Sequence, residues 1–167
     1  MESRSPLSNL SEDFCTFVHL YKFVIRRKEN MKIVICGSMK VSIKMLELNN
    51  ELLRLGHEVI LPRHTQEYAE MKTSDHIHNE SVKNKIENDL IRDYYEKIKA
   101  SDAILVVNCD LNGVVGYVGG NSFLEMGFAH VLGKKIFLLN QIPQTSFKDE
   151  LIAMQPVVLN ENLKNLT

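Results

Sequence analysis

"DAILVVN", residues 102–108, is the stretch that decides the fold class of this 167-residue chain. Five consecutive apolar residues stand between two polar ends, a pattern typical of a parallel strand that is covered on both faces of its sheet. Four other short apolar runs have a similar character: KIVICG (32–37), HEVILP (57–62), KKIFLLN (134–140) and PVVLN (156–160). We therefore expect five strands.

Helical patterns separate these apolar runs. After the first run, Met45, Leu48 and Leu52 recur at helical spacing, and Gly56 ends the pattern. Residues 63–81 are polar and irregular, and they predict a loop or lid. Further helices are expected over about 81–100, 121–133 and 147–154.

Strands and helices thus alternate from residue 31 onward, which predicts a doubly wound α/β fold with right-handed crossovers. We expect a mainly parallel five-stranded sheet of the flavodoxin- or Rossmann-like kind, with helices on both faces. Such sheets bind ligands in the crevice outside the carboxyl ends of their strands. Residues 37–39, residues 108–110 and the loop before residue 121 are expected to converge there.

Composition excludes several classes of protein. With 44% hydrophobic residues, 25% charged residues and a net charge of −1, the chain has no charge excess that favours nucleic acid or an anionic membrane as partner. Cys15, Cys36 and Cys109 lack the spacing of a zinc site, so reduced thiols in a cytoplasmic protein are expected. No apolar run approaches the length of a membrane span.

The first 30 residues differ from the rest, because a polar start is followed by an apolar stretch that ends in Arg26, Arg27 and Lys28. A secretory signal has its charge before the apolar part, so this segment does not fit one. It fits an appended helix, a flexible arm or an upstream start of the reading frame. We expect an ancillary tail over 1–30 and one α/β domain over 31–167.

Glu125 is the most unusual residue of the sequence. It follows a Gly-rich loop and shares its helical phase with Phe128, Ala129 and Leu132, so it is predicted to face the sheet beside the ligand crevice. The alternative is an ordinary acidic residue near a positive helix end, but that does not explain the face on which it lies. A poorly solvated carboxylate in this place is a usable nucleophile or base.

The run SDAILVVN…GYVGGNSFLEMGFAHVLGKKIFLL resembles the nucleoside 2-deoxyribosyltransferase family and its relatives, the nucleoside 5′-phosphate N-glycosidases. The matching motif is Glu125-Met126-Gly127-Phe128-Ala129 followed by Gly133-Lys134, and MKIVICGSMK looks like the family's first strand and substrate-binding loop. The resemblance spans about residues 31–140. It implies that Glu125 attacks the anomeric carbon of a ribosyl or deoxyribosyl group, after which water or a second base takes the sugar.

The sequence departs from this family at two positions. The family often carries an aspartate six residues before the nucleophile, where this chain has Gly119. The family aspartate that contacts the leaving base falls on Tyr94, with Asp93 next to it, and either side chain is a candidate for that contact. Asp102, at the start of its strand, is expected to have a structural role.

The remaining candidates are substrate-binding residues, each with a structural alternative. Loops and a helix start at the crevice present them: Gly37, Ser38, Met39, Asn108, Tyr117, Gly120, Asn121 and Ser122. Backbone N–H groups after the first strand can bind a phosphate or sugar, or form a plain turn. Asn108 either binds or forms a turn, Tyr117 either stacks on a base or packs its loop, and Asn121 and Ser122 can cap their helix.

We expect neither a metal nor a cofactor. His64, His76 and His78 lie in the polar segment after the second strand, without a supporting carboxylate or cysteine. Three kinds of function remain open: an enzyme acting on the N-glycosidic bond of a nucleoside or nucleoside monophosphate, a non-catalytic nucleotide sensor, and a hydrolase of another nucleotide derivative such as NAD. Apolar residues on several faces of helix 121–132 also predict a homodimer or larger homo-oligomer.

Overall fold

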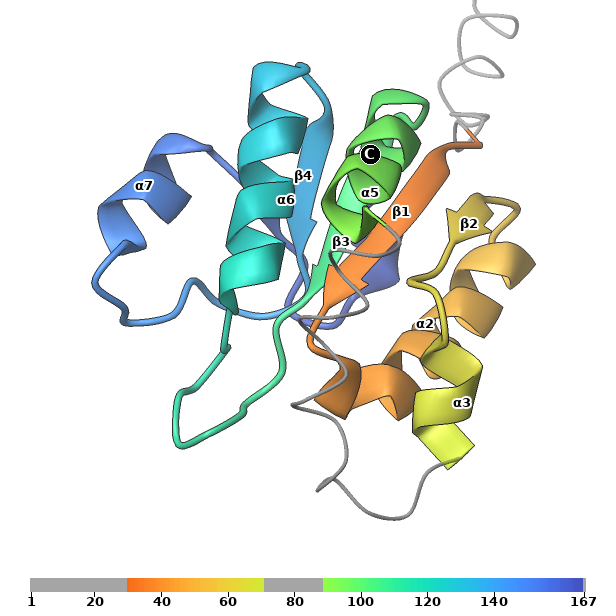
Figure 1. Cartoon of the computed structure of the whole chain (residues 1–167), viewed down its shortest axis with the longest axis horizontal. Coiled ribbons are helices and arrows are strands. Elements are labelled where there is room, and N and C mark those ends of the chain that lie inside the picture. Colours follow the sequence, from red (N-terminus) through yellow and green to blue (C-terminus); the bar gives the residue numbers. More distant parts are fainter. Residues whose placement is uncertain (1–29, 71–88, 167) are drawn as a thin grey trace, which may run out of the picture. The chain divides into compact units, whose positions relative to one another are not determined.

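A five-stranded parallel sheet lies at the centre of the computed structural model, which describes residues 30–70 and 89–166 (Figure 1). Its strand order is β2-β1-β3-β4-β5, the flavodoxin-like order of doubly wound folds. The α/β prediction is therefore confirmed. The strands are β1 Lys32–Gly37, β2 Glu58–Ile60, β3 Ala103–Val107, β4 Lys135–Leu138 and β5 Val157–Val158.

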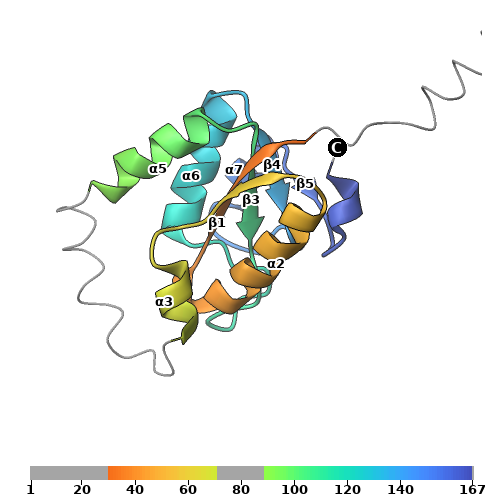
Figure 2. The same cartoon turned by 90° about the vertical axis from the view of Figure 1, so that its right-hand side faces the viewer.

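Helices cover both faces of the sheet. The chain steps from β1 outward to β2 and then returns across β1 to β3, so right-handed crossovers place the first helix and the later ones on opposite faces. Figure 2 shows α2 on one side of the strands and α5 and α6 on the other. The helices are α2 Ser42–Arg54, α3 Thr65–Glu70, α5 Leu90–Lys99, α6 Gly120–Val131 and α7 Lys148–Ala153, with short 3-10 turns η1 Met39–Val41 and η2 Leu163–Asn165.

Alternation along the central strands divides the apolar side chains between two cores. On β1, Ile33 and Ile35 face α2, whereas Val34 and Cys36 face α5 and α6, and all four are fully buried. Strand β3 is buried along its whole length, as the run DAILVVN predicts. We call the two sides the α2 face and the α5–α6 face.

The predicted faces of two helices can now be compared with the structure. In α2, Met45, Leu48 and Leu52 are buried as expected. In α6, the residues buried against the sheet are Ser122, Met126 and Ala129, so the stripe that packs on the strands is displaced from the row predicted to contain Glu125. Glu125 is half-buried and lies at the flank of that stripe.

The segment after β2 differs from its prediction. A loop or lid was expected over 63–81, but residues 65–70 form α3, whose only fully buried residue is Thr65. Six residues are too few for a recognisable helical period, because they make less than two turns. The predicted helix over 81–100 is confirmed from Leu90 to Lys99, and its earlier part lies outside the described residues.

Several expectations concern residues that are not described. The ancillary tail, with the exception of Asn30, and His76 and His78 belong to this group. Asn30 to Leu166 forms one compact unit. Asp102 is structural as expected, because its carboxylate accepts a hydrogen bond of 2.7 Å from the Lys32 backbone N–H. Within the described residues, no helix is long and apolar enough to cross a membrane.

Candidate functional site

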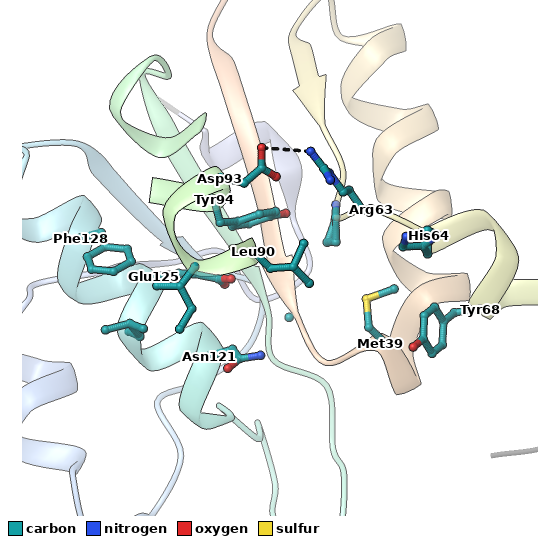
Figure 3. A pocket seen from close by; sticks show the side chains of 14 residues that line it. Met39, Arg63, His64, Tyr68, Leu90, Asp93, Tyr94, Asn121, Glu125 and Phe128 are labelled. Carbon is teal, nitrogen blue, oxygen red and sulfur yellow. Dashed lines mark hydrogen bonds and ion pairs between the residues drawn. The ribbon is translucent and has the colours of Figure 1, made fainter. Parts of the chain in front are cut away.

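A pocket opens where β1 and β2 end, on the α5–α6 side of the sheet (Figure 3). One wall comes from α5 and α6, the opposite wall from the end of β2 and from α3, and the residues after β1 lie between them. The position agrees with the rule that doubly wound sheets bind ligands at the carboxyl ends of their strands. The lining residues that bear on chemistry are Gly37, Met39, Arg63, His64, Tyr68, Asp93, Tyr94, Asn121 and Glu125.

Glu125 projects from α6 into this pocket (Figure 3). Apolar side chains border it, because Leu124 and Phe128 of the same helix line the pocket as well. Its inner neighbour is the fully buried thiol of Cys36 on β1; burial, the charge of Glu125 and a hydrogen bond with Glu125 all raise the pKa of this thiol. The carboxylate is therefore held between the sheet and the open space in which a ligand would lie.

Tyr94 has its hydroxyl group committed to the backbone. The group donates a hydrogen bond of 2.6 Å to the Ile35 carbonyl oxygen, and the side chain is only 9% exposed. Burial raises the pKa of Tyr94 well above its usual value, and the charges of Cys36, Glu125 and Asp93 raise it further. The phenol thus stays protonated at neutral pH and ties α5 to β1 beside the pocket.

Asp93 connects the two walls of the pocket. One carboxylate oxygen lies 2.7 Å from the Lys97 ammonium group one turn along α5, and the other lies 3.4 Å from Nη2 of Arg63 (Figure 3). The Arg63 contact is long for a hydrogen bond to a charged group, whereas the Lys97 contact is of ordinary length. Asp93 thus has Lys97 as its closer cationic partner, and its contact with the Arg63 guanidinium is the longer of the two.

The three residues at the end of β1, from Gly37 to Met39, differ in role: some line the pocket and one caps a turn. Gly37 and Met39 line the pocket. A Cβ at Gly37 would lie 2.6 Å from the Met45 Cε atom and 3.2 Å from the Val107 carbonyl oxygen, so a larger residue there would require the Met45 side chain to move. Ser38 does not line it. Its hydroxyl accepts a hydrogen bond of 3.3 Å from the Lys40 N–H and caps η1, in agreement with the turn alternative.

At the start of α6, only Asn121 reaches the pocket. The N-cap of the helix is Gly119, so Asn121 and Ser122 lie inside the first turn and do not cap it, contrary to one alternative considered for them. Ser122 is buried against the sheet, and Gly120 does not line the pocket. Among the three residues predicted here to bind substrate, the structure thus brings one to the site.

Asn108 and Tyr117 lie away from the pocket. Asn108 is fully buried, its Oδ1 accepts from the Asn140 N–H at 2.8 Å, and its Nδ2 is 3.0 Å from the Gln141 carbonyl oxygen. It therefore fixes the loop after β3, in agreement with the structural alternative considered for it, and it does not line this pocket. The Tyr117 ring packs over Gly119, where an added Cβ would be 3.2 Å from the ring atom Cε1.

The wall formed by Arg63, His64 and Tyr68 was not predicted as a binding surface. A signal for it exists, because Arg63 follows a strand and carboxyl ends of neighbouring parallel strands meet at one edge. His64 is engaged with Glu67, whose carboxylate oxygen is 2.7 Å from Nδ1. Within the described ranges 30–70 and 89–166, no group of three or more His, Cys, Asp or Glu side chains is arranged to hold a metal ion.

Chemically, the pocket places a half-buried carboxylate on one wall and a guanidinium on the other. Such an arrangement can attack an electrophilic carbon from one side and stabilise negative charge that develops on the far side. Comparisons with protein-family models, with curated proteins and with solved structures find no match.

Proposed function

We propose that this protein cleaves the N-glycosidic bond of a nucleoside or nucleoside monophosphate, with Glu125 as the nucleophile. The observation that carries the proposal is the placement of Glu125 in the pocket, flanked by apolar side chains and opposite Arg63. The motif around Glu125, which resembles that of the deoxyribosyltransferases, points to the same chemistry. A simple binder of anionic ligands would gain nothing from a carboxylate in this place.

In the first step, a Glu125 oxygen forms a bond to the anomeric carbon while the bond from that carbon to the base nitrogen breaks. The base leaves with the electron pair, and a glycosyl ester of Glu125 remains. In the second step, water or the nitrogen of a second base attacks the same carbon and releases the carboxylate. Two inversions give net retention, as in retaining glycosidases. Water yields hydrolysis, and a second base yields transfer.

The opposite wall of the pocket is suited to the leaving base. In a displacement at carbon, the leaving group lies on the side away from the nucleophile, which here is the side of Arg63. The Arg63 guanidinium can donate hydrogen bonds to an acceptor atom of the base and stabilise the charge that it gains. Asp93, beside it, can accept a hydrogen bond from an N–H group of the base.

Tyr94 fits the base contact less well than Asp93 does. Its hydroxyl proton is donated to the Ile35 carbonyl, so a base would have to displace that bond. Of the two candidates considered for this contact, we therefore assign Asp93 to the base and Tyr94 to the positioning of α5. Asn121, on the Glu125 side of the pocket, is placed to bind a sugar hydroxyl or a phosphate.

A second function, nucleotide binding without catalysis, is favoured by one observation. Gly119 stands where the family often has an aspartate, and a Cβ added there would lie 3.2 Å from the Tyr117 ring, which would have to shift to make room for a side chain. Catalysis would then depend on Glu125 and Asp93 without that third carboxylate. Hydrolysis of another nucleotide derivative uses the same nucleophile and differs in the leaving group.

The test is a panel of nucleosides, nucleoside monophosphates and NAD, incubated with and without a second free base and resolved by chromatography. Release of free base, or formation of a new nucleoside, is the expected result. A slow 2-fluoro sugar substrate should leave a sugar ester on the peptide that contains Glu125, detected by mass spectrometry. Binding without any product would favour the sensor, and an ester on another residue would refute the assignment.

A further inference from the structure

Cys36 is a buried thiol that the proposed reaction does not use. It lies on β1 next to Gly37, the residue that lines the pocket, and its side chain faces the α5–α6 side. Its exposed fraction is 0%, so neither solvent nor substrate reaches the sulfur atom. It packs in the same cluster as Tyr94 and Met126, which come from the two helices that form the Glu125 wall.

The thiol has one hydrogen and two candidate acceptors. One is the Val34 carbonyl oxygen, 3.9 Å from the sulfur, which is at the long limit for such a bond. The other is the Glu125 side chain, with which Cys36 forms a hydrogen bond. A carboxylate is the stronger acceptor because it carries charge, and the Val34 contact is at the distance limit, so Glu125 is the better acceptor for the thiol proton.

We propose that Cys36 is a positioning residue, whose thiol donates a hydrogen bond to the Glu125 carboxylate and holds it ionised at the end of β1. The proposal deepens the proposed function, because it says how the nucleophile is kept in place. The contact itself, however, can be measured without any substrate.

The thiol is a donor throughout the neutral range. Burial raises the pKa of Cys36 well above its usual value, and the charge of Glu125 and the hydrogen bond with it raise that pKa further. A thiolate in this place would repel the carboxylate. The favoured pair of protonation states is therefore a protonated Cys36 and an ionised Glu125. By the same linkage, the thiol lowers the pKa of Glu125 relative to a chain without it.

Other groups also face Glu125 and stay in place when Cys36 is changed. From α5 come Tyr94 and Asp93, and across the pocket lie Arg63 and His64. The Tyr94 proton is given to the Ile35 carbonyl, so this hydroxyl does not replace the thiol as donor. A substitution at position 36 therefore isolates the contribution of the sulfur.

The experiment is a pH titration of the Glu125 side-chain carboxyl carbon by NMR on the full-length, 13C-glutamate-labelled chain, with the resonance assigned by Glu125→Gln. Cys36→Ala should raise the pKa of Glu125 by about 0.5 to 1 unit, the size expected for loss of one hydrogen bond to a charged group. Cys36→Ser keeps a donor and should leave that pKa at the wild-type value or below it.

Val34→Ala is the matched control. Val34 is also fully buried, lies two residues away on the same side of β1 and belongs to the same cluster, but it has no donor. A purely structural role of Cys36 would move the Glu125 titration equally in Val34→Ala and Cys36→Ala. That outcome, or an unchanged titration in Cys36→Ala, would overturn the proposal.

A reciprocal measurement protects the test if Cys36→Ala folds poorly. In a chain with Cys15→Ser and Cys109→Ser, Glu125→Gln should lower the pKa of Cys36, followed by the ultraviolet absorbance of the thiolate. An unchanged thiol titration would count against the contact.

If glycosides are cleaved, the acid limb of the pH profile of kcat should shift in Cys36→Ala as the NMR titration does. A shifted titration without any turnover would refute the function and leave the positioning role standing.

Discussion

The two faces of the sheet differ in what they bury. On the α2 face, the buried cluster consists of apolar side chains, and the titratable groups at its border, His57 and Cys109, lie outside the pocket. On the α5–α6 face, the same strands bury Cys36 and Tyr94, with Glu125 and Asp93 at the border of the core. The first face does not line the pocket, whereas the second places its titratable side chains in the pocket or directly beneath it. Stability and chemistry should therefore respond to different substitutions.

The largest expected effect concerns Glu125 and should appear in activity alone. Glu125→Gln should reduce kcat for glycoside cleavage on the order of 10⁴-fold, because the amide has nearly the same shape but cannot act as nucleophile. Thermal unfolding should change little. Steady-state kinetics and calorimetry on the same preparation check this. Full activity of the variant would show that Glu125 is not the nucleophile.

Next in size is a pair of core substitutions, one on each face. Leu52→Ala on the α2 face and Met126→Ala on the α5–α6 face should each lower the free energy of unfolding by about 2 to 5 kcal/mol, because both side chains are fully buried. Only Met126→Ala should also weaken nucleotide binding, since Met126 follows Glu125 on α6 and is buried in the cluster on that face of the sheet. Denaturant unfolding and calorimetric titration measure the two effects. Equal loss of binding in both variants would contradict the division of roles.

A smaller effect is expected at alkaline pH. The pKa of Cys36 in the folded protein is raised above its usual value of 9.0. Well below pH 9 the thiol is therefore protonated in both the folded and the unfolded chain, and it adds no pH dependence to the free energy of unfolding. As pH rises above that usual value, the unfolded chain loses the proton first and the folded state loses stability. Tyr94 adds to the loss above its usual value of 10.0.

The melting temperature should therefore fall between pH 8 and 11, and the part of the fall that starts near pH 9 should be smaller in Cys36→Ala. Leu52→Ala is the control, because it destabilises the chain without removing a titratable group. If the melting temperature falls with pH in the same way in the wild type, Cys36→Ala and Leu52→Ala, the buried thiol is not responsible for the fall.

The smallest effect lies at the start of α6. Gly119→Ala places a Cβ 3.2 Å from the Tyr117 ring, which is partly exposed and can shift, so we expect a loss of no more than about 1 kcal/mol. Tyr117→Ala should remove most of this cost in the double variant, which a double-mutant cycle of unfolding free energies measures. If the free-energy changes of the two substitutions simply add, the Tyr117 ring is not the reason why Gly119→Ala destabilises the chain.

The alternation of strands and helices was predictable, because each buried strand is a short apolar run and each long helix repeats its apolar residues over several turns. The helix over Thr65–Glu70 was not, since it makes less than two turns and buries only one residue completely. Its start depends on His64 in a left-handed backbone conformation (φ 64°), a choice that the residue type does not dictate.

The site was predictable on one wall only. Helical phase brought Glu125 close to its observed place, because Phe128 and Ala129 show which side of the helix is covered. Arg63 enters the pocket because β2 lies beside β1, and strand order is a property of the whole chain. The sequence left the role of Asn108 open, because a polar residue after a strand is equally suited to bind a ligand or to fix a loop. In the structure its side-chain amide donates to the carbonyl oxygens of Asn140 and Gln141.

The two edge strands have a consequence for self-association. In the part of the chain that the structure describes, the sheet ends in β2 with 3 residues and β5 with 2 residues. Such short edges offer few unpaired backbone groups onto which a strand from another molecule can add, and proteins use this device against edge-to-edge aggregation. A second copy would therefore find its apolar contact surface on helices rather than on these edges. On α6, Val131 is 84% exposed, and Leu124, which also lines the pocket, is 41% exposed.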